Sequence, residues 1–218
     1  MKVGITPLGN KKIDNEFSAL LDIDSDIFLS PIAYGEYKGS KYLITSPLSG
    51  YHMCVPPIEI NRLITKFQTK NNNKIILKSH PRVIQILNGV KNRISDEDYL
   101  RFISSLDLEL LSEVVPEHGD FTPWNIFSNK NKFSLIDLEY YCKQGLPHLD
   151  LIKYYFQVGR LLLKYEGLDL ISFINKESQL EYPHTYISLF LLKEIMILSE
   201  EGICYNYILD LLNKINSF

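Results

Sequence analysis

The sequence has few cysteines, no long apolar run and no surplus of positive charge, and each shortage argues against a class of protein. Its three cysteines, Cys54, Cys142 and Cys204, are far apart and form no C-x-x-C pair. This spacing indicates neither a zinc ribbon nor a disulfide framework. We therefore expect buried free thiols in a reducing compartment. The formal net charge of -3 disfavours nonspecific binding to nucleic acid, which depends on surplus positive charge.

Long apolar segments are also missing. No uninterrupted apolar stretch approaches the roughly 18 residues that a membrane span needs, and residues 1–12 contain no apolar core of a signal peptide. We therefore expect a cytoplasmic protein with neither a membrane nor a nucleic acid as its partner. What is present is ordinary for a globular chain: 218 residues, 45% of them hydrophobic and 22% charged, enough for one large domain or two small ones.

The first fifty residues mix strand-like and helix-like patterns. Residues 2–6 form a short strand candidate, and residues 10–23 carry apolar side chains at helical spacing. The following segment reads as a hairpin, with arms at 32–37 and 41–46 and a turn at 38–40. The beginning of the chain therefore predicts a small mixed layer of strands and one helix.

After Gly50 the pattern becomes mainly helical. Helices are expected after Pro57, after Pro81 and near Ser95, and again from Asp150 to the end. The last of these regions has a predicted buried stripe: Tyr154, Val158, Leu161 and Leu162. Between the helical regions, residues 125–128 and 133–137 predict two short strands joined by the polar turn 129–132.

The segment HGDFTPWNIF, residues 118–127, interrupts the helical pattern and carries candidate chemistry. Asp120 has a carboxylate that can orient a hydroxyl and accept its proton, and Pro123 stiffens the loop that leads to Asn125. Asn125 offers a neutral oxygen to a hard cation, and Asp137 follows an apolar strand. A base, a metal-binding amide and a metal-binding carboxylate around one site are what phosphoryl transfer from a magnesium nucleotide requires.

These residues resemble a known family. HGDFTPWN is similar to the catalytic loop of the aminoglycoside phosphotransferase and choline kinase superfamily, and that loop is similar to the H-R-D-x-x-x-x-N loop of protein kinases. IDLE resembles the metal-binding segment of the family, and GLPHLDL resembles its G-x-P-x-x-D-L segment. The resemblance implies that Asp120 is the catalytic base and that Asn125 and Asp137 bind Mg²⁺. It implies structural support from His118 and Asp150.

The resemblance extends more loosely toward the N-terminus, covering roughly residues 1–165. Glu16 resembles the helix glutamate that pairs with a strand lysine, and Lys2 is the best candidate for that lysine. YLITSPLSG resembles the fifth strand and hinge, where backbone groups from Ser46 to Leu48 would meet the nucleotide base. The resemblance thus implies ATP or GTP as phosphoryl donor.

One departure concerns the small lobe. With Lys2 as the strand lysine, the first two strands of the usual lobe and their glycine-rich loop have no room, and no glycine-rich turn precedes Lys2. A naturally shortened enzyme, a gene lacking its first coding part and a degenerate relative all fit this departure. We expect weak nucleotide binding and an unpaired edge along residues 3–5, which an upstream segment or a partner could cover.

The predicted fold is α+β and protein-kinase-like with two lobes. A reduced small β lobe spans residues 1–48, and a mainly helical large lobe spans residues 49–218. The predicted function is transfer of the γ-phosphoryl group of ATP or GTP to a hydroxyl of a small molecule, such as an aminoglycoside, choline, ethanolamine or a sugar. The alternative is a nucleotide-binding pseudokinase or interaction module that lacks turnover.

Other interpretations of single residues stay open at this point. His118 and Asp120 could form the H-x-D metal pair of a metallophosphatase, although that fold needs further ligands on several strands. Glu16 could be a solvated charge on a helix surface. Lys2, so near the chain start, could be disordered.

Overall fold

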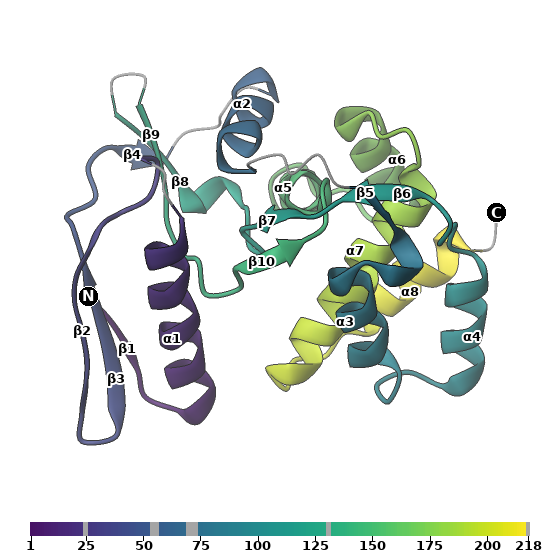
Figure 1. Cartoon of the computed structure of the whole chain (residues 1–218). Helices are drawn as coiled ribbons and strands as arrows, with labels where there is room; N and C mark the ends of the chain where they lie inside the picture. Colours follow the sequence, from purple (N-terminus) through teal and green to yellow (C-terminus); the bar gives the residue numbers. More distant parts are fainter. Residues whose placement is uncertain (24–25, 53–56, 69–73, 130–131, 217–218) are drawn as a thin grey trace. The chain divides into compact units, whose positions relative to one another are not determined.

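The computed structural model describes residues 1–23, 26–52, 57–68, 74–129 and 132–216, which form a mixed α+β fold (Figure 1). Contacts within the chain divide it into two compact units. The first comprises Met1–Thr69 and Pro116–Lys143, and the second comprises Lys70–Val115 and Gln144–Phe218. The predicted lobe boundary at residue 48 stays a prediction. No helix in the described part of the chain is long and apolar enough to cross a membrane.

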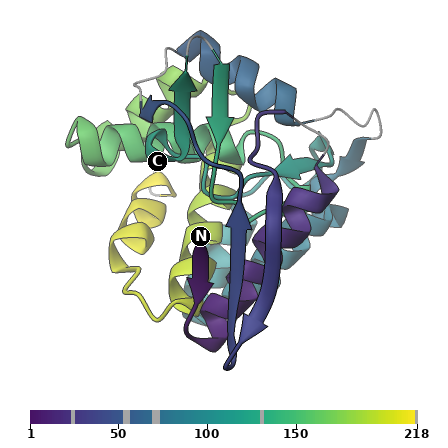
Figure 2. The ribbon, with the colours of Figure 1, turned by 90° about the vertical axis from the view of Figure 1, so that its left-hand side faces the viewer.

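The first unit contains an antiparallel sheet with one helix packed on it. Its strands are β1 (Lys2–Gly4), β2 (Pro31–Tyr37) and β3 (Ser40–Thr45), in the order β1-β3-β2. Figure 2 looks onto these three strands, with helix α1 behind them. The predicted hairpin is confirmed: Lys38 and Gly39 both have positive φ, which matches the right-handed twist of the two strands.

Helix α1 (Pro7–Asp22) begins where the sequence supplies a start signal. The Thr6 hydroxyl accepts a hydrogen bond from the backbone N–H of Gly9, and Pro7 occupies the first turn. Ile13 and Ala19 are buried against the sheet side, and so is Glu16. A buried glutamate on an otherwise apolar face indicates a partner, because an isolated buried charge is strongly unfavourable.

A second small sheet in the same unit has the order β4-β8-β9, formed by β4 (Tyr51–His52), β8 (Ile126–Asn129) and β9 (Lys132–Leu135). The predicted strand pair after the HGD segment is therefore confirmed, and turn residues 130–131 lie outside the described residues. Helix α2 (Pro57–Phe67) belongs to this unit too.

Two further strand pairs are short. Strand β5 (Lys74–Ile76) pairs with β6 (Leu111–Glu113), and β7 (Val115–Glu117) pairs with β10 (Cys142–Gly145). The sequence predicted none of these four strands, nor β4. Segments of two to four residues are too short to display a period-two pattern.

The second unit is mainly helical. Its helices are α3 (Pro81–Val90), α4 (Asp96–Ser104), α5 (Leu149–Gln157), α6 (Gly167–Ser178), α7 (Pro183–Glu200) and α8 (Asn206–Ile215). Short 3₁₀ turns span Leu77–Ser79 in this unit and Pro123–Asn125 in the first. Helix α7 is buried on all sides from Thr185 to Met196, so it forms the centre of this unit. Its buried Glu194 is paired with Lys153 of α5 at 2.8 Å.

Two sequence predictions about burial are wrong. Tyr154 is buried, but Leu161 and Leu162 of the predicted stripe are 40% and 55% exposed. Helix α5 gives way to a π-helical turn at Val158–Leu162 and then ends, so the helical phase is lost there. The cysteines were predicted to be buried, yet Cys204 is exposed and Cys142 is half-buried, while Cys54 lies outside the described residues.

Candidate functional site

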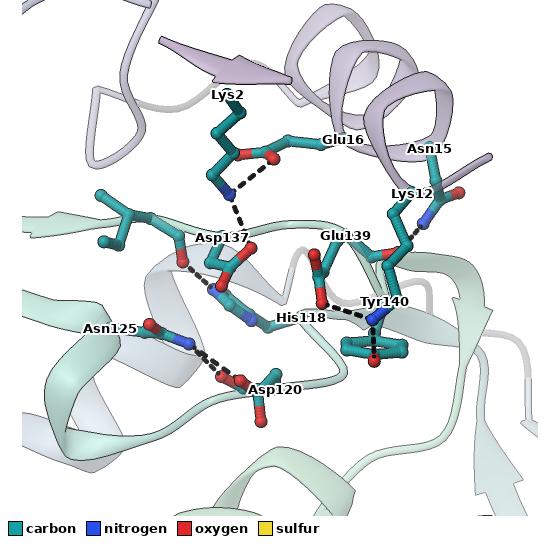
Figure 3. Close-up of polar contacts among 11 residues, drawn as sticks. Lys2, Lys12, Asn15, Glu16, His118, Asp120, Asn125, Asp137, Glu139 and Tyr140 are labelled. Atoms are coloured by element: carbon teal, nitrogen blue, oxygen red, sulfur yellow. Dashed lines mark hydrogen bonds and ion pairs between the residues drawn. The ribbon is translucent and has the colours of Figure 1, made fainter. Parts of the chain in front are cut away.

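Every predicted site residue except Asp150 lies in the first compact unit. The HGD segment leaves β7 and passes through a 3₁₀ turn, Pro123–Asn125, before entering β8. The side-chain amide nitrogen of Asn125 donates to the Asp120 carbonyl oxygen at 2.9 Å and to its carboxylate Oδ2 at 3.0 Å. Asn125 is buried. The acid and the amide that the sequence places five residues apart therefore form one rigid pair (Figure 3).

Gly119 makes this turn possible. Its φ is 86°, a conformation that favours glycine, and an added Cβ would lie 2.2 Å from the carbonyl oxygen of Tyr140. No side chain fits at that separation. The residue before Asp120 is therefore in close backbone contact with the loop that follows β9, and this contact couples the two candidate segments.

His118 is completely buried, and its ring is hydrogen-bonded to the segment that carries Asp137. Its Nε2–H donates to the carbonyl oxygen of Ile136 at 3.0 Å. Burial lowers the pKa of His118 to about 4, although the nearby carboxylates of Asp120 and Asp137 oppose that shift. The imidazole is therefore neutral at physiological pH. The described residues contain no group of three or more His, Cys, Asp and Glu that could hold a metal, so the further ligands that an H-x-D metal pair needs are not found there.

Asp137 stands just after β9 with a φ of 72°, in the left-handed region where aspartate is among the tolerated residues. Its Oδ1 accepts from Nζ of Lys2 at 2.6 Å, and the same ammonium donates to Oε2 of Glu16 at 2.7 Å. One lysine thus bridges the helix α1 glutamate and the loop aspartate, as Figure 3 shows.

This bridge decides two of the open interpretations. The Glu16 side chain is only 6% exposed, so it is not a solvated surface charge, and Lys2 is ordered by two ion pairs. Burial lowers the pKa of Lys2, but the Glu16 and Asp137 carboxylates outweigh burial and hold that pKa above its ordinary value. Burial also raises the pKa of Glu16, against the opposing effect of the Lys2 ammonium. The ion-pair geometry keeps Lys2 charged.

A pocket of about 150 Å³ opens beside this bridge. Lys2, Glu16 and Asp137 form its polar part, and the remaining lining is mostly apolar. The residues of that remaining lining are Met1, Leu20, Phe28, Leu29, Leu43, Thr45, Leu48, Leu135, Ile136 and Leu138. An apolar slot with one lysine and two carboxylates at one part of its wall suits a ligand with an apolar body and a polar end.

The two predicted hinge residues differ in their positions. Leu48 lines the pocket. Ser46 is not among the lining residues, and its backbone N–H donates to the carbonyl oxygen of Ser30 at 2.8 Å. Its backbone N–H is therefore engaged within the protein. The assignment of both residues to nucleotide binding stays a prediction.

The two residues predicted to bind a cation, Asn125 and Asp137, both carry side-chain oxygen atoms. Both hydrogen bonds of Asn125 use its amide nitrogen, so its Oδ1 is the atom suited to coordination. No group of three or more His, Cys, Asp and Glu able to hold a metal occurs within the described ranges. One carboxylate and one amide fit Mg²⁺ better than zinc, because Mg²⁺ typically takes few protein ligands and completes its shell with water and phosphate oxygens.

Sequence reasoning missed four residues next to this site: Lys12, Asn15, Glu139 and Tyr140. Lys12 and Asn15 lie on α1 one turn apart from each other, and Asn15 directly precedes Glu16. Glu139 is the last residue of the IDLE motif, and Tyr140 follows it. The available signal was a polar face on α1 aligned with Glu16.

Asp150 lies in the second unit, in the first turn of α5, and is fully buried. Burial of an acid indicates a structural role, because a buried carboxylate is retained only where it is satisfied by partners. Its predicted support of the catalytic loop stays a prediction.

Comparison with known proteins shows that this chain is similar in fold to a solved structure. No protein-family model and no curated protein matches the sequence. Among solved structures, a thermostable mutant of aminoglycoside phosphotransferase APH(4)-Ia, in a ternary complex with ADP and hygromycin B, matches with a TM-score of 0.59 and 11% identity. The match covers 95% of this chain and 82% of that chain. The chain therefore shares its fold with an aminoglycoside phosphotransferase, which confirms the predicted resemblance at the level of the fold.

Proposed function

We propose that this chain is a phosphotransferase that moves the γ-phosphoryl group of ATP or GTP to a hydroxyl group of a small molecule. The observation that carries the proposal is the double ion pair of Lys2 with Glu16 and Asp137 beside an apolar pocket. A lysine held between two acids remains cationic and fixed in place, which suits it to bind phosphate oxygens.

In this proposal the nucleotide base enters the apolar part of the pocket, which Leu48 lines. Backbone groups from Ser46 to Leu48 meet the edge of the base, except for the Ser46 N–H, which is bound to the Ser30 carbonyl oxygen. Lys2 then binds the phosphates, and Glu16 keeps the lysine oriented. This use of Lys2 does not require it to leave Glu16, because an ammonium group has three donors.

Asn125 and Asp137 would hold Mg²⁺, which supplies charge neutralisation on the β- and γ-phosphate oxygens when it is bound. Two hydrogen-bonding contacts within the protein orient these two side chains. The Asn125 amide nitrogen is tied to Asp120, and the Asp137 carboxylate is tied to Lys2 through one oxygen. Both metal-binding side chains are thereby oriented before any ligand arrives.

Asp120 is the proposed base. Its carboxylate accepts the proton of the acceptor hydroxyl while the hydroxyl oxygen forms a bond to the γ-phosphorus. The bond between that phosphorus and the β–γ bridging oxygen breaks, and the products are a phosphate ester and a nucleoside diphosphate. The hydrogen bond from Asn125 keeps one carboxylate oxygen fixed, so the other points in a defined direction.

The wider arrangement follows the same proposal. We infer a kinase-like division into two lobes, support of the catalytic loop by Asp150, and action in the cytoplasm. The acceptor belongs to the hydroxyl compounds that this superfamily phosphorylates: aminoglycosides, choline, ethanolamine and sugars. The similar solved structure holds ADP and hygromycin B, which supports a nucleotide together with an aminoglycoside-type acceptor.

A second candidate is a nucleotide-binding module without turnover. It is favoured by the lining of the pocket, which includes no glycine, and by strand β1, which among the described residues pairs with β3 alone. The predicted unpaired edge is therefore present. Without backbone N–H groups above the phosphates, the transferring group would be poorly held.

A two-stage experiment tests the proposal. Thermal unfolding is first measured with ATP and with GTP, each with and without Mg²⁺, because a ligand that binds only the folded chain raises its melting temperature. Formation of nucleoside diphosphate is then measured across a panel of hydroxyl compounds. Acceptor-dependent turnover supports the enzyme, and stabilisation without turnover supports the binding module. Absence of both effects refutes both candidates.

A further inference from the structure

Helix α1 contacts the loop that carries Asp137 through more than the Lys2 bridge. The side-chain amide nitrogen of Asn15 donates to the carbonyl oxygens of Glu139 and Tyr141, at 2.8 and 3.2 Å. These two carbonyls belong to the turn directly after Asp137. A single amide group therefore holds two backbone positions of this turn, and Figure 3 shows the bond to Glu139.

Lys12, one helical turn before Asn15, supports the same loop. Its ammonium donates to Oε1 of Glu139 at 2.9 Å and to the hydroxyl of Tyr140, and it lies 4.5 Å from the centre of the Tyr140 ring. Lys12, Asn15 and Glu16 lie on one face of α1, and that face is directed at residues 137–141.

The loop at residues 137–141 depends on such contacts because its backbone adopts an uncommon conformation at Asp137. Asp137 has a φ of 72°, a conformation that residues other than glycine adopt rarely. Such a conformation persists only where surrounding contacts maintain it. The following residues also contact the HGD segment, since the Tyr140 carbonyl oxygen occupies the space where a Gly119 side chain would be. A shift of the loop would therefore displace both Asp137 and the backbone beside Asp120.

We propose that Asn15 is a positioning residue that keeps Asp137 in its cation-binding conformation by fixing the two carbonyl groups of Glu139 and Tyr141. This inference rests on the proposed function for its chemical meaning, because Asp137 is there a ligand of Mg²⁺. Its structural part, that Asn15 orders residues 137–141, stands independently of any activity.

The chain offers a matched control on the same helix. The side chain of Asn10 also makes two hydrogen bonds to backbone groups, to the carbonyl oxygen of Gly39 and from the N–H of Lys41, each at 2.9 Å. Those contacts hold α1 to the β2–β3 turn and not to the Asp137 loop. Asn10→Ala and Asn15→Ala therefore remove equivalent bonds from the same helix at different places.

The first measurement is backbone hydrogen exchange of peptides within residues 136–141, compared among the wild-type chain, Asn15→Ala, Asn15→Asp and Asn10→Ala. We expect exchange in this segment about tenfold faster in Asn15→Ala, because two hydrogen bonds that resist local opening are lost. Asn15→Asp keeps the side-chain size but cannot donate, so it should give the same result even if the alanine variant folds poorly. Unchanged exchange in Asn15→Asp would overturn the inference, and so would equally faster exchange in Asn10→Ala.

The second measurement is the Mg²⁺ concentration needed for half of the ATP-dependent rise in melting temperature. We expect Asn15→Ala to need about tenfold more Mg²⁺ while Asn10→Ala behaves as the wild-type chain does. Faster loop exchange with an unchanged Mg²⁺ requirement would overturn the role of Asn15 in cation binding. A wild-type chain with no response to Mg-ATP would refute the proposed function itself, and hydrogen exchange alone would then decide whether Asn15 orders the loop.

Discussion

Mild acid should destabilise the chain through His118. The folded imidazole is fully buried and has a pKa of about 4, whereas an unfolded histidine titrates near 6.5. As the pH falls below about 6.5, the His118 imidazole binds a proton in the unfolded chain but stays neutral in the folded chain. The free energy of unfolding therefore decreases with falling pH through this window and levels off below about pH 4.

The size of the effect follows from the two pKa values. A difference of about 2.5 units corresponds to about 3 kcal/mol in total, and about 2 kcal/mol of this is lost between roughly pH 7 and pH 4.5. Such a loss is a large fraction of the stability of an ordinary domain. Chemical unfolding curves recorded at several pH values, with the slope against denaturant checked for constancy, measure it directly.

The control is His118→Gln, which places an amide N–H near the position of Nε2 and cannot titrate. It should still donate to the Ile136 carbonyl oxygen, the partner of His118 at 3.0 Å, and its unfolding free energy should vary with pH by about 2 kcal/mol less than that of the parent over the same window. Comparing the two chains removes the contributions of the carboxylates and of the other histidines. Parallel pH profiles for the two chains would refute the assignment of a buried neutral imidazole at this position.

Four further outcomes are expected. Asp120→Asn should reduce phosphoryl transfer by about 10²–10⁴-fold without loss of nucleotide binding, as acceptor turnover and calorimetry would show; parent-like turnover would contradict its role as base. Asp137→Ala should abolish the Mg²⁺-dependent part of the ATP-induced rise in melting temperature, and an unchanged rise would exclude it as a metal ligand. Gly119→Ala should cost about 2–4 kcal/mol of unfolding free energy, because its methyl group would meet the Tyr140 carbonyl oxygen at 2.2 Å; a loss below about 0.5 kcal/mol would contradict this contact. Calorimetry should give a nucleotide dissociation constant of about 0.1 mM or weaker, and micromolar affinity would show that the phosphates are well covered.

The N-terminal sheet, helix α1 and the motif loop were predictable because their signals are local. The turn at Lys38 and Gly39 and the five-residue spacing of Asp120 and Asn125 each specify geometry within a few residues. The predicted helix over residues 10–23 missed the cap at Thr6, which starts α1 at Pro7. Lys2 could be matched to Glu16 only by family resemblance, because no local pattern links a strand lysine to a helix glutamate 14 residues away.

The rest depended on tertiary context. Strands such as β4 and β5 have two or three residues and form only because a distant segment pairs with them. Leu161 and Leu162 are exposed because a π-helical turn shifts the helical phase there. The spacing of apolar residues in the sequence does not predict such a turn. The contacts of Asn15 could not be predicted, because its partners are backbone carbonyls more than 120 residues away, and carbonyl groups are present in every residue.

The left-handed backbone at Asp137 restricts which amino acids natural variation or a mutant library can supply there. Glycine, asparagine and aspartate tolerate this conformation best, and of these three only aspartate carries a carboxylate for Lys2. Glutamate would keep the charge but would be strained in that backbone and would move its oxygens one methylene further out. In a library randomised at this codon, ligand-dependent selection should therefore return aspartate almost alone, while selection for folding alone should enrich glycine and asparagine.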